Sequence, residues 1–98
     1  MTYMEVLNLI NAQYGGIKSI ILWISEKLLD YGNDKISDQQ WFEIWKKNKG
    51  QIIGGIAGEI AADHYPNNPQ ALKLIKEVIY DHIYIIEDNF KEAGVVEG

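Results

Sequence analysis

The stretch from Gly50 to His64, GQIIGGIAGEIAADH, constrains the fold of this chain more than any other stretch does. At helical spacing its isoleucines fall on one side, and small residues repeat at every fourth position on the other side. The isoleucines are Ile52, Ile53, Ile56 and Ile60, and the repeating small residues are Gly50, Gly54, Gly58 and Ala62. Each glycine costs a helix about 1 kcal/mol relative to alanine, so several in one helix favour a close approach by another backbone. The stretch therefore predicts a central helix packed on both sides, either by its own chain or across a symmetry axis.

Start and stop signals divide the rest of the chain into further helices. Thr2-x-x-Glu and Ser37-x-x-Gln match the capping box, and Asn68 followed by Pro69 is a favoured helix start. Gly50 either ends a third helix or opens the fourth. The predicted helices span residues 3–14, 17–31, 38–49, 50–64 and 69–93.

No segment alternates with a period of two, which is the pattern of a half-buried strand. We therefore predict an all-α fold, a compact bundle of about five helices in a single domain that spans residues 1–98. The fourth helix lies inside this bundle, and the fifth is a long C-terminal strut of about 35 Å.

Composition excludes several classes of function. The formal net charge is −5, and all nine basic residues are lysines, so the chain lacks the arginines that usually read guanine and clamp phosphate. We therefore expect no nucleic-acid partner. The absence of cysteine excludes disulfides and fits a reducing compartment, and no apolar run approaches the length of a membrane span. We expect a soluble, cytoplasmic protein with no membrane partner.

The second predicted helix carries two leucines outside its main apolar stripe. Leu22 and Leu29 are seven residues apart and lie roughly opposite that stripe, with Trp23 to one side. This edge is either covered within the monomer or faces another subunit, and the sequence does not choose between the two. Trp41 and Trp45 lie one turn apart on the third helix, where the pair either joins the core or fills a pocket on a partner.

The last predicted helix is apolar over half its circumference, with Tyr80 and Tyr84 on the charged side. A half-apolar helix that is longer than its neighbours packs on two partners, and a second copy of the chain is one way to cover its overhang. The candidate interaction residues are Leu22, Trp23, Leu29, Trp41, Trp45, Tyr80 and Tyr84.

Three ionisable residues form a candidate buried polar or ligand site. Glu59 and Asp63 lie one turn apart on the central helix, and His82 falls on the apolar face of the last helix. The histidine either acts as a base or is a core residue with satisfied hydrogen bonds, and the carboxylates either do acid–base work or mark the rim of the helix. The pattern Glu-x-x-x-Asp-His ends at both His64 and His82, but its side chains do not converge on one ion, so we expect no metal.

Neither a catalytic nucleophile nor a cofactor motif is present. Ser37 is used as a cap, the other serines have no histidine nearby in sequence, and the glycines do not form a phosphate-binding loop. Lys46, Lys47 and Lys49 either complement a helix end and stay solvated or contact an anion. We therefore predict no catalytic residue and no cofactor, and do not expect an enzyme.

Two classes of function remain after these exclusions. The first is a small non-enzymatic interaction module that forms a homo-oligomer and binds another protein, by analogy with accessory and inhibitor proteins of phages and mobile elements. The alternative is a small-molecule binder that holds a nucleotide-like ligand between helices or subunits. A third hypothesis, an acid–base or metal-dependent enzyme that uses Glu59, Asp63, His64 and His82, is tested by metal analysis and Glu59→Gln.

Overall fold

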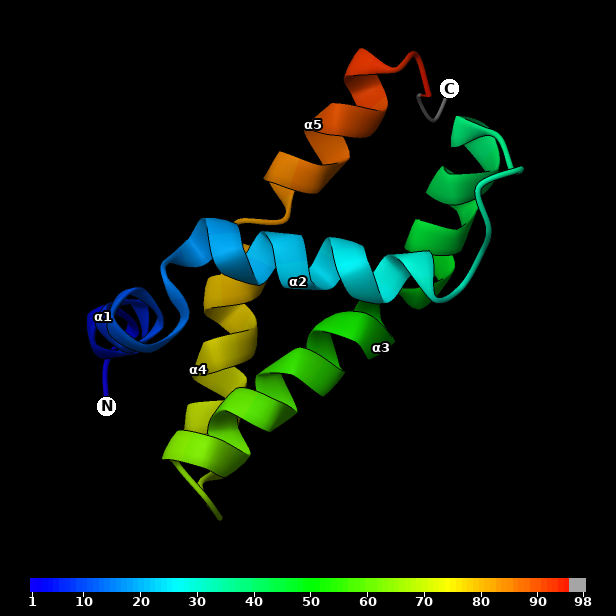
Figure 1. The fold of residues 1–98 in the computed structure, drawn as a ribbon. Helices are drawn as coiled ribbons and strands as arrows, with labels where there is room; N and C mark the ends of the chain where they lie inside the picture. Colours follow the sequence, from blue (N-terminus) through cyan, green and yellow to red (C-terminus); the bar gives the residue numbers. More distant parts are fainter. Residues whose placement is uncertain (96–98) are drawn as a thin grey trace.

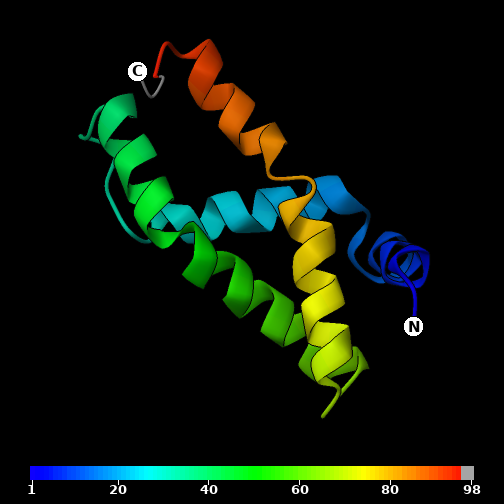
Figure 2. The ribbon, with the colours of Figure 1, turned by 180° about the vertical axis from the view of Figure 1, so that it is seen from behind.

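The computed structural model describes residues 1–95 and contains no strand within them (Figures 1 and 2). Its helices are α1 (Tyr3–Tyr14), α2 (Ile17–Leu29), α3 (Asp38–His64), α4 (Pro69–Tyr80) and α5 (Tyr84–Glu92). The predicted all-α fold class is confirmed. Residues 96–98, the end of the predicted domain, lie outside the described residues.

The helices begin where the capping signals placed them. The Thr2 hydroxyl accepts a 3.2 Å hydrogen bond from the backbone N–H of Glu5. At the start of α3, the Ser37 hydroxyl accepts from the backbone N–H of Gln40, and the Gln40 side chain accepts from the Ser37 N–H. The Asn68 side chain caps α4 in the same way, through the N–H of Ala71 at 3.1 Å. These side chains satisfy N–H groups that have no partner inside the helix, which fixes the three starting points.

Helix α3 runs without interruption for 27 residues, from Asp38 to His64. The prediction that Gly50 separates two helices is wrong, because Gly50 adopts no positive φ and the helix continues through it. Glycine weakens a helix but does not end one unless the backbone turns left-handed, as it does at Gly15 with φ 83°. The central glycine-rich stretch is therefore the second half of a long helix.

The predicted long C-terminal helix is instead broken into α4 and α5 at residues 81–83. The backbone N–H of His82 donates to the carbonyl of Ile79, three residues before it. In a regular α-helix it would donate to the carbonyl of Val78, four residues before it. The imidazole Nδ1 of His82 donates to the Val78 carbonyl at 2.8 Å and so takes over the bond that the backbone has dropped. The single strut of the sequence prediction is therefore wrong, and His82 satisfies the polar group that the break leaves open.

The helices are arranged as one packed pair, α3 and α4, with α2 crossing on one side of it. Helices α3 and α4 pack against each other, α2 packs across α3, α1 contacts α2 and α4, and α5 contacts α2. Helix α2 lies in front of α3 and α4 in Figure 1 and behind them in Figure 2, so it forms one outer side of the molecule. The molecule measures 40 × 23 × 21 Å, and its radius of gyration of 14.3 Å exceeds the value of about 13 Å typical of a chain this long. The bundle is therefore elongated.

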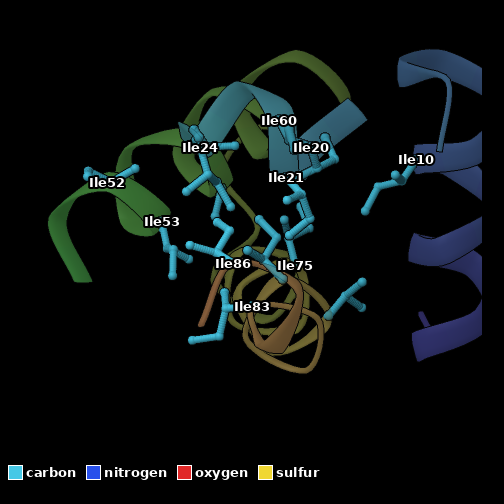
Figure 3. Close-up of a cluster of buried hydrophobic side chains, with 14 of the residues drawn as sticks. Ile10, Ile20, Ile21, Ile24, Ile52, Ile53, Ile60, Ile75, Ile83 and Ile86 are labelled. Atoms are coloured by element: carbon cyan, nitrogen blue, oxygen red, sulfur yellow. The ribbon is translucent and has the colours of Figure 1, made fainter. Parts of the chain in front are cut away.

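The hydrophobic core is built mainly from isoleucine (Figure 3). Every helix contributes at least one buried isoleucine. One from each helix in chain order is Ile10, Ile24, Ile53, Ile75 and Ile86. Each such side chain stabilises the fold by about 1.5–3 kcal/mol relative to an exposed position. The predicted isoleucine face of the central stretch, from Ile52 to Ile60, is buried and therefore confirmed.

Helix α5 is held against the first half of α3 by one polar cluster and one aromatic contact. The indole of Trp45, which is fully buried, donates a 3.0 Å hydrogen bond to Glu87. Lys49 pairs with the same carboxylate oxygen at 3.1 Å. The rings of Phe42 and Phe90 pack with their centroids 5.2 Å apart. This end of the molecule thus combines a partly buried hydrogen bond with a small apolar contact.

Candidate interaction surface

The most exposed leucines of the described chain lie on the outer side of α2. Leu22 is 61% exposed and Leu29 is 62% exposed, so residues 1–95 do not cover the second apolar edge of this helix. Ile21, Ile24 and Leu28 face the opposite way, into the core. The alternative in which the monomer itself covers the leucine edge is therefore wrong, and its contact with another subunit stays a prediction.

The small-residue face of α3 is uncovered over most of its length. Within residues 1–95, a Cβ atom added to Gly54, Gly55 or Gly58 would have no neighbouring heavy atom within 4 Å. Ala62, on the same face, is exposed. The prediction that the chain packs both sides of this helix is therefore wrong at Gly54, Gly55 and Gly58, although the Tyr80 hydroxyl lies 3.7 Å from where a Cβ at Gly50 would be. Packing of this face across a symmetry axis remains a prediction.

The predicted aromatic residues separate into buried and exposed groups. Trp45 is fully buried, and Trp41 and Trp23 are half-buried against the core, so the tryptophans do not form one open surface. Tyr80 is 42% exposed and Tyr84 is 55% exposed, and they flank the break between α4 and α5. Trp45 thus belongs to the core, while the two tyrosines remain accessible to a partner.

A polar and aromatic cluster that the sequence did not reveal joins α1, α2 and α3. The Tyr14 hydroxyl lies 3.1 Å from Nε2 of His64, and the Tyr14 ring stacks on Trp23 with centroids 6.2 Å apart. Burial raises the pKa of the Tyr14 phenol above its usual value, and the negative charges of Asp63 and Glu59 raise it further. Tyr14 and His64 are 50 positions apart, and no local pattern connects them.

Glu59, Asp63 and His82 do not form a common site. Glu59 and Asp63 are exposed, and His82 is half-buried. Asp63 precedes the start of α4, whereas His82 follows its end, and a helix of 12 residues spans about 18 Å. The histidine bonds within its own turn, and the carboxylates face solvent beside Tyr14. The candidate buried site of these three residues is therefore wrong, and the exposure of the two carboxylates agrees with the alternative that they mark the rim of the helix.

The three clustered lysines lie in the middle of α3, because that helix continues past them. Lys49 pairs with Glu87, and Lys46 pairs with Glu43 at 3.2 Å and lies 4.9 Å from the centre of the Phe42 ring. Lys47 is exposed. The account in which they complement a helix C-terminus is therefore wrong, since the helix ends at His64.

Two hollows lie along α3. One, of about 500 Å³, is bounded by the second half of α3, the 65–68 turn and the start of α4, and includes Gly58, Ala62 and Leu72. The other, of about 370 Å³, lies between α2 and α3, and its rim carries Lys27, Tyr31, Gln51 and Glu59. Both are large enough for a small ligand.

Within residues 1–95, no three histidine, cysteine or acidic side chains gather in a way that could hold a metal ion. None of the described helices is both long and apolar enough to cross a bilayer. No protein-family model, curated protein or solved structure matches the chain.

Proposed function

We propose that this protein is a small, non-enzymatic interaction module that associates with itself and presents its remaining exposed surface to another protein. The observation that carries the proposal is the pair of leucines on the outer side of α2. Leu22 and Leu29 are each more than 60% exposed, although the residue before each of them, Ile21 or Leu28, is buried in the core. Exposed apolar side chains aligned on one helix face are typical of contact surfaces.

The experiment that tests self-association is a measurement of mass in solution by light scattering over a series of protein concentrations. A mass that rises with concentration from one chain towards two or more supports the proposal. A mass of a single chain at every concentration, up to about 1 mM, contradicts it, because even weak transient complexes populate at such concentrations.

Binding of a small molecule is a second candidate function, which the hollow between α2 and α3 favours. Its rim offers an ammonium group from Lys27, carboxylates from Asp30 and Glu59, an aromatic ring from Tyr31 and an amide from Gln51. These groups suit a ligand with a planar ring and hydrogen-bond donors. A thermal-shift screen with nucleotides tests this function. A nucleotide that raises the melting temperature in the wild type but not in Tyr31→Ala supports it.

The setting of this function is also part of the proposal. The cysteine-free composition fits a reducing compartment, and we place the protein in the cytoplasm. The role of an accessory or inhibitor protein of a phage or mobile element rests on analogy with small acidic helical proteins. Cell fractionation followed by detection of the chain tests the compartment.

A further inference from the structure

The outer side of α2 carries a charge pattern that is complementary to the same pattern read in the opposite direction. Lys18, Leu22 and Glu26 follow one another at intervals of four residues, so they lie along one line of the helix surface. All three are exposed, and the leucine has a positive charge one turn before it and a negative charge one turn after it. We infer that a second copy of the chain docks along this line with its α2 antiparallel, an inference that rests on the proposed self-association.

Antiparallel docking pairs the charges. With a two-fold axis through Leu22, position n of one α2 faces position 44 − n of the other, so Lys18 faces Glu26 of the second copy. Symmetry produces this pair twice, on either side of a contact between the two Leu22 side chains. Within residues 1–95 neither Lys18 nor Glu26 forms an ion pair, so both charges are available to a second copy. Parallel docking in register would instead bring like charges together.

The same alignment accommodates the second exposed leucine. Leu29 falls opposite the corner that Gly15 and Gly16 form between α1 and α2 of the second copy. These two residues have no side chain of their own, although the Ser19 hydroxyl lies 3.0 Å from where a Cβ at Gly15 would be. Large side chains facing small ones are what close packing between two surfaces requires.

The face is accessible in the described chain. Figures 1 and 2 place α2 on one outer side of the molecule, with the other helices behind it or beside it. The open face of α3 is a weaker choice for the same contact, because Gly54, Gly55 and Gly58 offer little apolar area to bury. The α2 face supplies both apolar area, from Leu22 and Leu29, and matched charge.

The small area of this contact indicates a weak dimer. Helix α2 has 13 residues and is therefore about 20 Å long, which places the contact at the small end of specific interfaces. Such interfaces belong to weak, reversible complexes, so we expect a dissociation constant on the order of 10–100 µM. The dimer should weaken as salt is added, because its ion pairs are at the surface.

The test is a charge exchange, with the dissociation constant measured by sedimentation equilibrium at low salt. Lys18→Glu alone and Glu26→Lys alone each place like charges opposite one another at two symmetric points, and should raise the dissociation constant by about tenfold. The double variant Lys18→Glu/Glu26→Lys restores opposite charges and should return to within about threefold of the wild type. Lys18→Glu places a negative charge near the N-terminus of α2, and Glu26→Lys places a positive charge near its C-terminus. Both changes are favourable to the helix dipole, so the monomer should keep its helicity.

Lys47→Glu is the matched control, because it makes the same change of charge at an exposed lysine of α3. It should leave the dissociation constant unchanged within about twofold, whereas Leu22→Glu should abolish the dimer. A wild-type dimer that neither single exchange on α2 weakens would overturn the α2 contact while the proposed self-association stands. A wild type that stays monomeric would overturn both.

Discussion

The indole Nε1 of Trp45 donates a 3.0 Å hydrogen bond to Oε2 of Glu87, and this contact joins the first half of α3 to α5. Glu87→Ala should lower the free energy of unfolding by about 1–3 kcal/mol, because it leaves the N–H of a fully buried indole without a partner. Glu87→Gln keeps an acceptor oxygen and should cost less. Urea unfolding followed by circular dichroism measures both differences.

The control for this prediction is Lys49→Ala, which removes the other partner of the same oxygen. About a third of each side chain of that ion pair is exposed, so its loss should cost less than about 1 kcal/mol. A loss as large as that of Glu87→Ala would show that the ion pair, rather than the indole bond, holds α5 in place.

Alanine at Gly54 or Gly55 should stabilise the monomer. Both positions lie inside α3, neither has a positive φ, and an added Cβ meets no heavy atom within 4 Å. Each substitution should therefore raise the free energy of unfolding by about 0.5–1 kcal/mol, through the better helix propensity of alanine. Thermal unfolding at low protein concentration gives the value for the monomer.

Gly32→Ala is the matched comparison, because a Cβ there would come within 2.7 Å of Ile36 and 2.8 Å of the Trp41 ring. It should destabilise the fold, since the indole must shift to make room. A Gly54→Ala variant that is less stable than the wild type would show that something packs on the open face of α3 in solution.

Alkaline pH should weaken the fold through Tyr14. The raised pKa means that the folded chain keeps the phenolic proton to higher pH than the unfolded chain does. The corresponding stabilisation is complete below the ordinary tyrosine pKa of about 10 and is lost as the pH rises from there through the folded pKa. Tyr14→Phe should make the free energy of unfolding fall less steeply above pH 10 than it does in the wild type. Equal slopes would contradict a proton held by the folded state.

His82→Ala should destabilise the turn between α4 and α5 by about 0.5–1.5 kcal/mol. The substitution removes the imidazole N–H that bonds to the Val78 carbonyl at 2.8 Å. His82→Asn offers a shorter donor that does not reach as far, and should recover part of the loss at most. Urea unfolding at neutral pH compares the three chains, and an unchanged midpoint in His82→Ala would show that water replaces the bond at no cost.

The sequence predicted the helix starts well because each start is encoded locally. Thr2, Ser37 and Asn68 lie within three residues of the N–H groups that they cap. The leucine edge of α2 was also recognisable, because Leu22 and Leu29 fall off the apolar stripe that the same helix needs for the core.

The break at residues 81–83 could not be predicted, because no proline or glycine marks it. On a straight helix Ile79, Ile83 and Ile86 would still fall on one continuous apolar face, so their spacing is the same with or without a bend. The turn brings Glu87 to Trp45, a residue 42 positions away, and that contact depends on how α3 is already placed. The Tyr14–His64 contact escaped prediction for the same reason.

The three-residue turn before α5 gives the molecule a segment that can detach alone. Helix α5 buries only Ile86 among its own nine residues, and its other anchors are Glu87 and Phe90. Its amide hydrogens should therefore exchange with solvent faster than those of α3 and α4, through local openings that leave the rest of the bundle folded. Each such opening uncovers the indole of Trp45, so the fluorescence of this tryptophan would report the departure of α5 before the bundle unfolds.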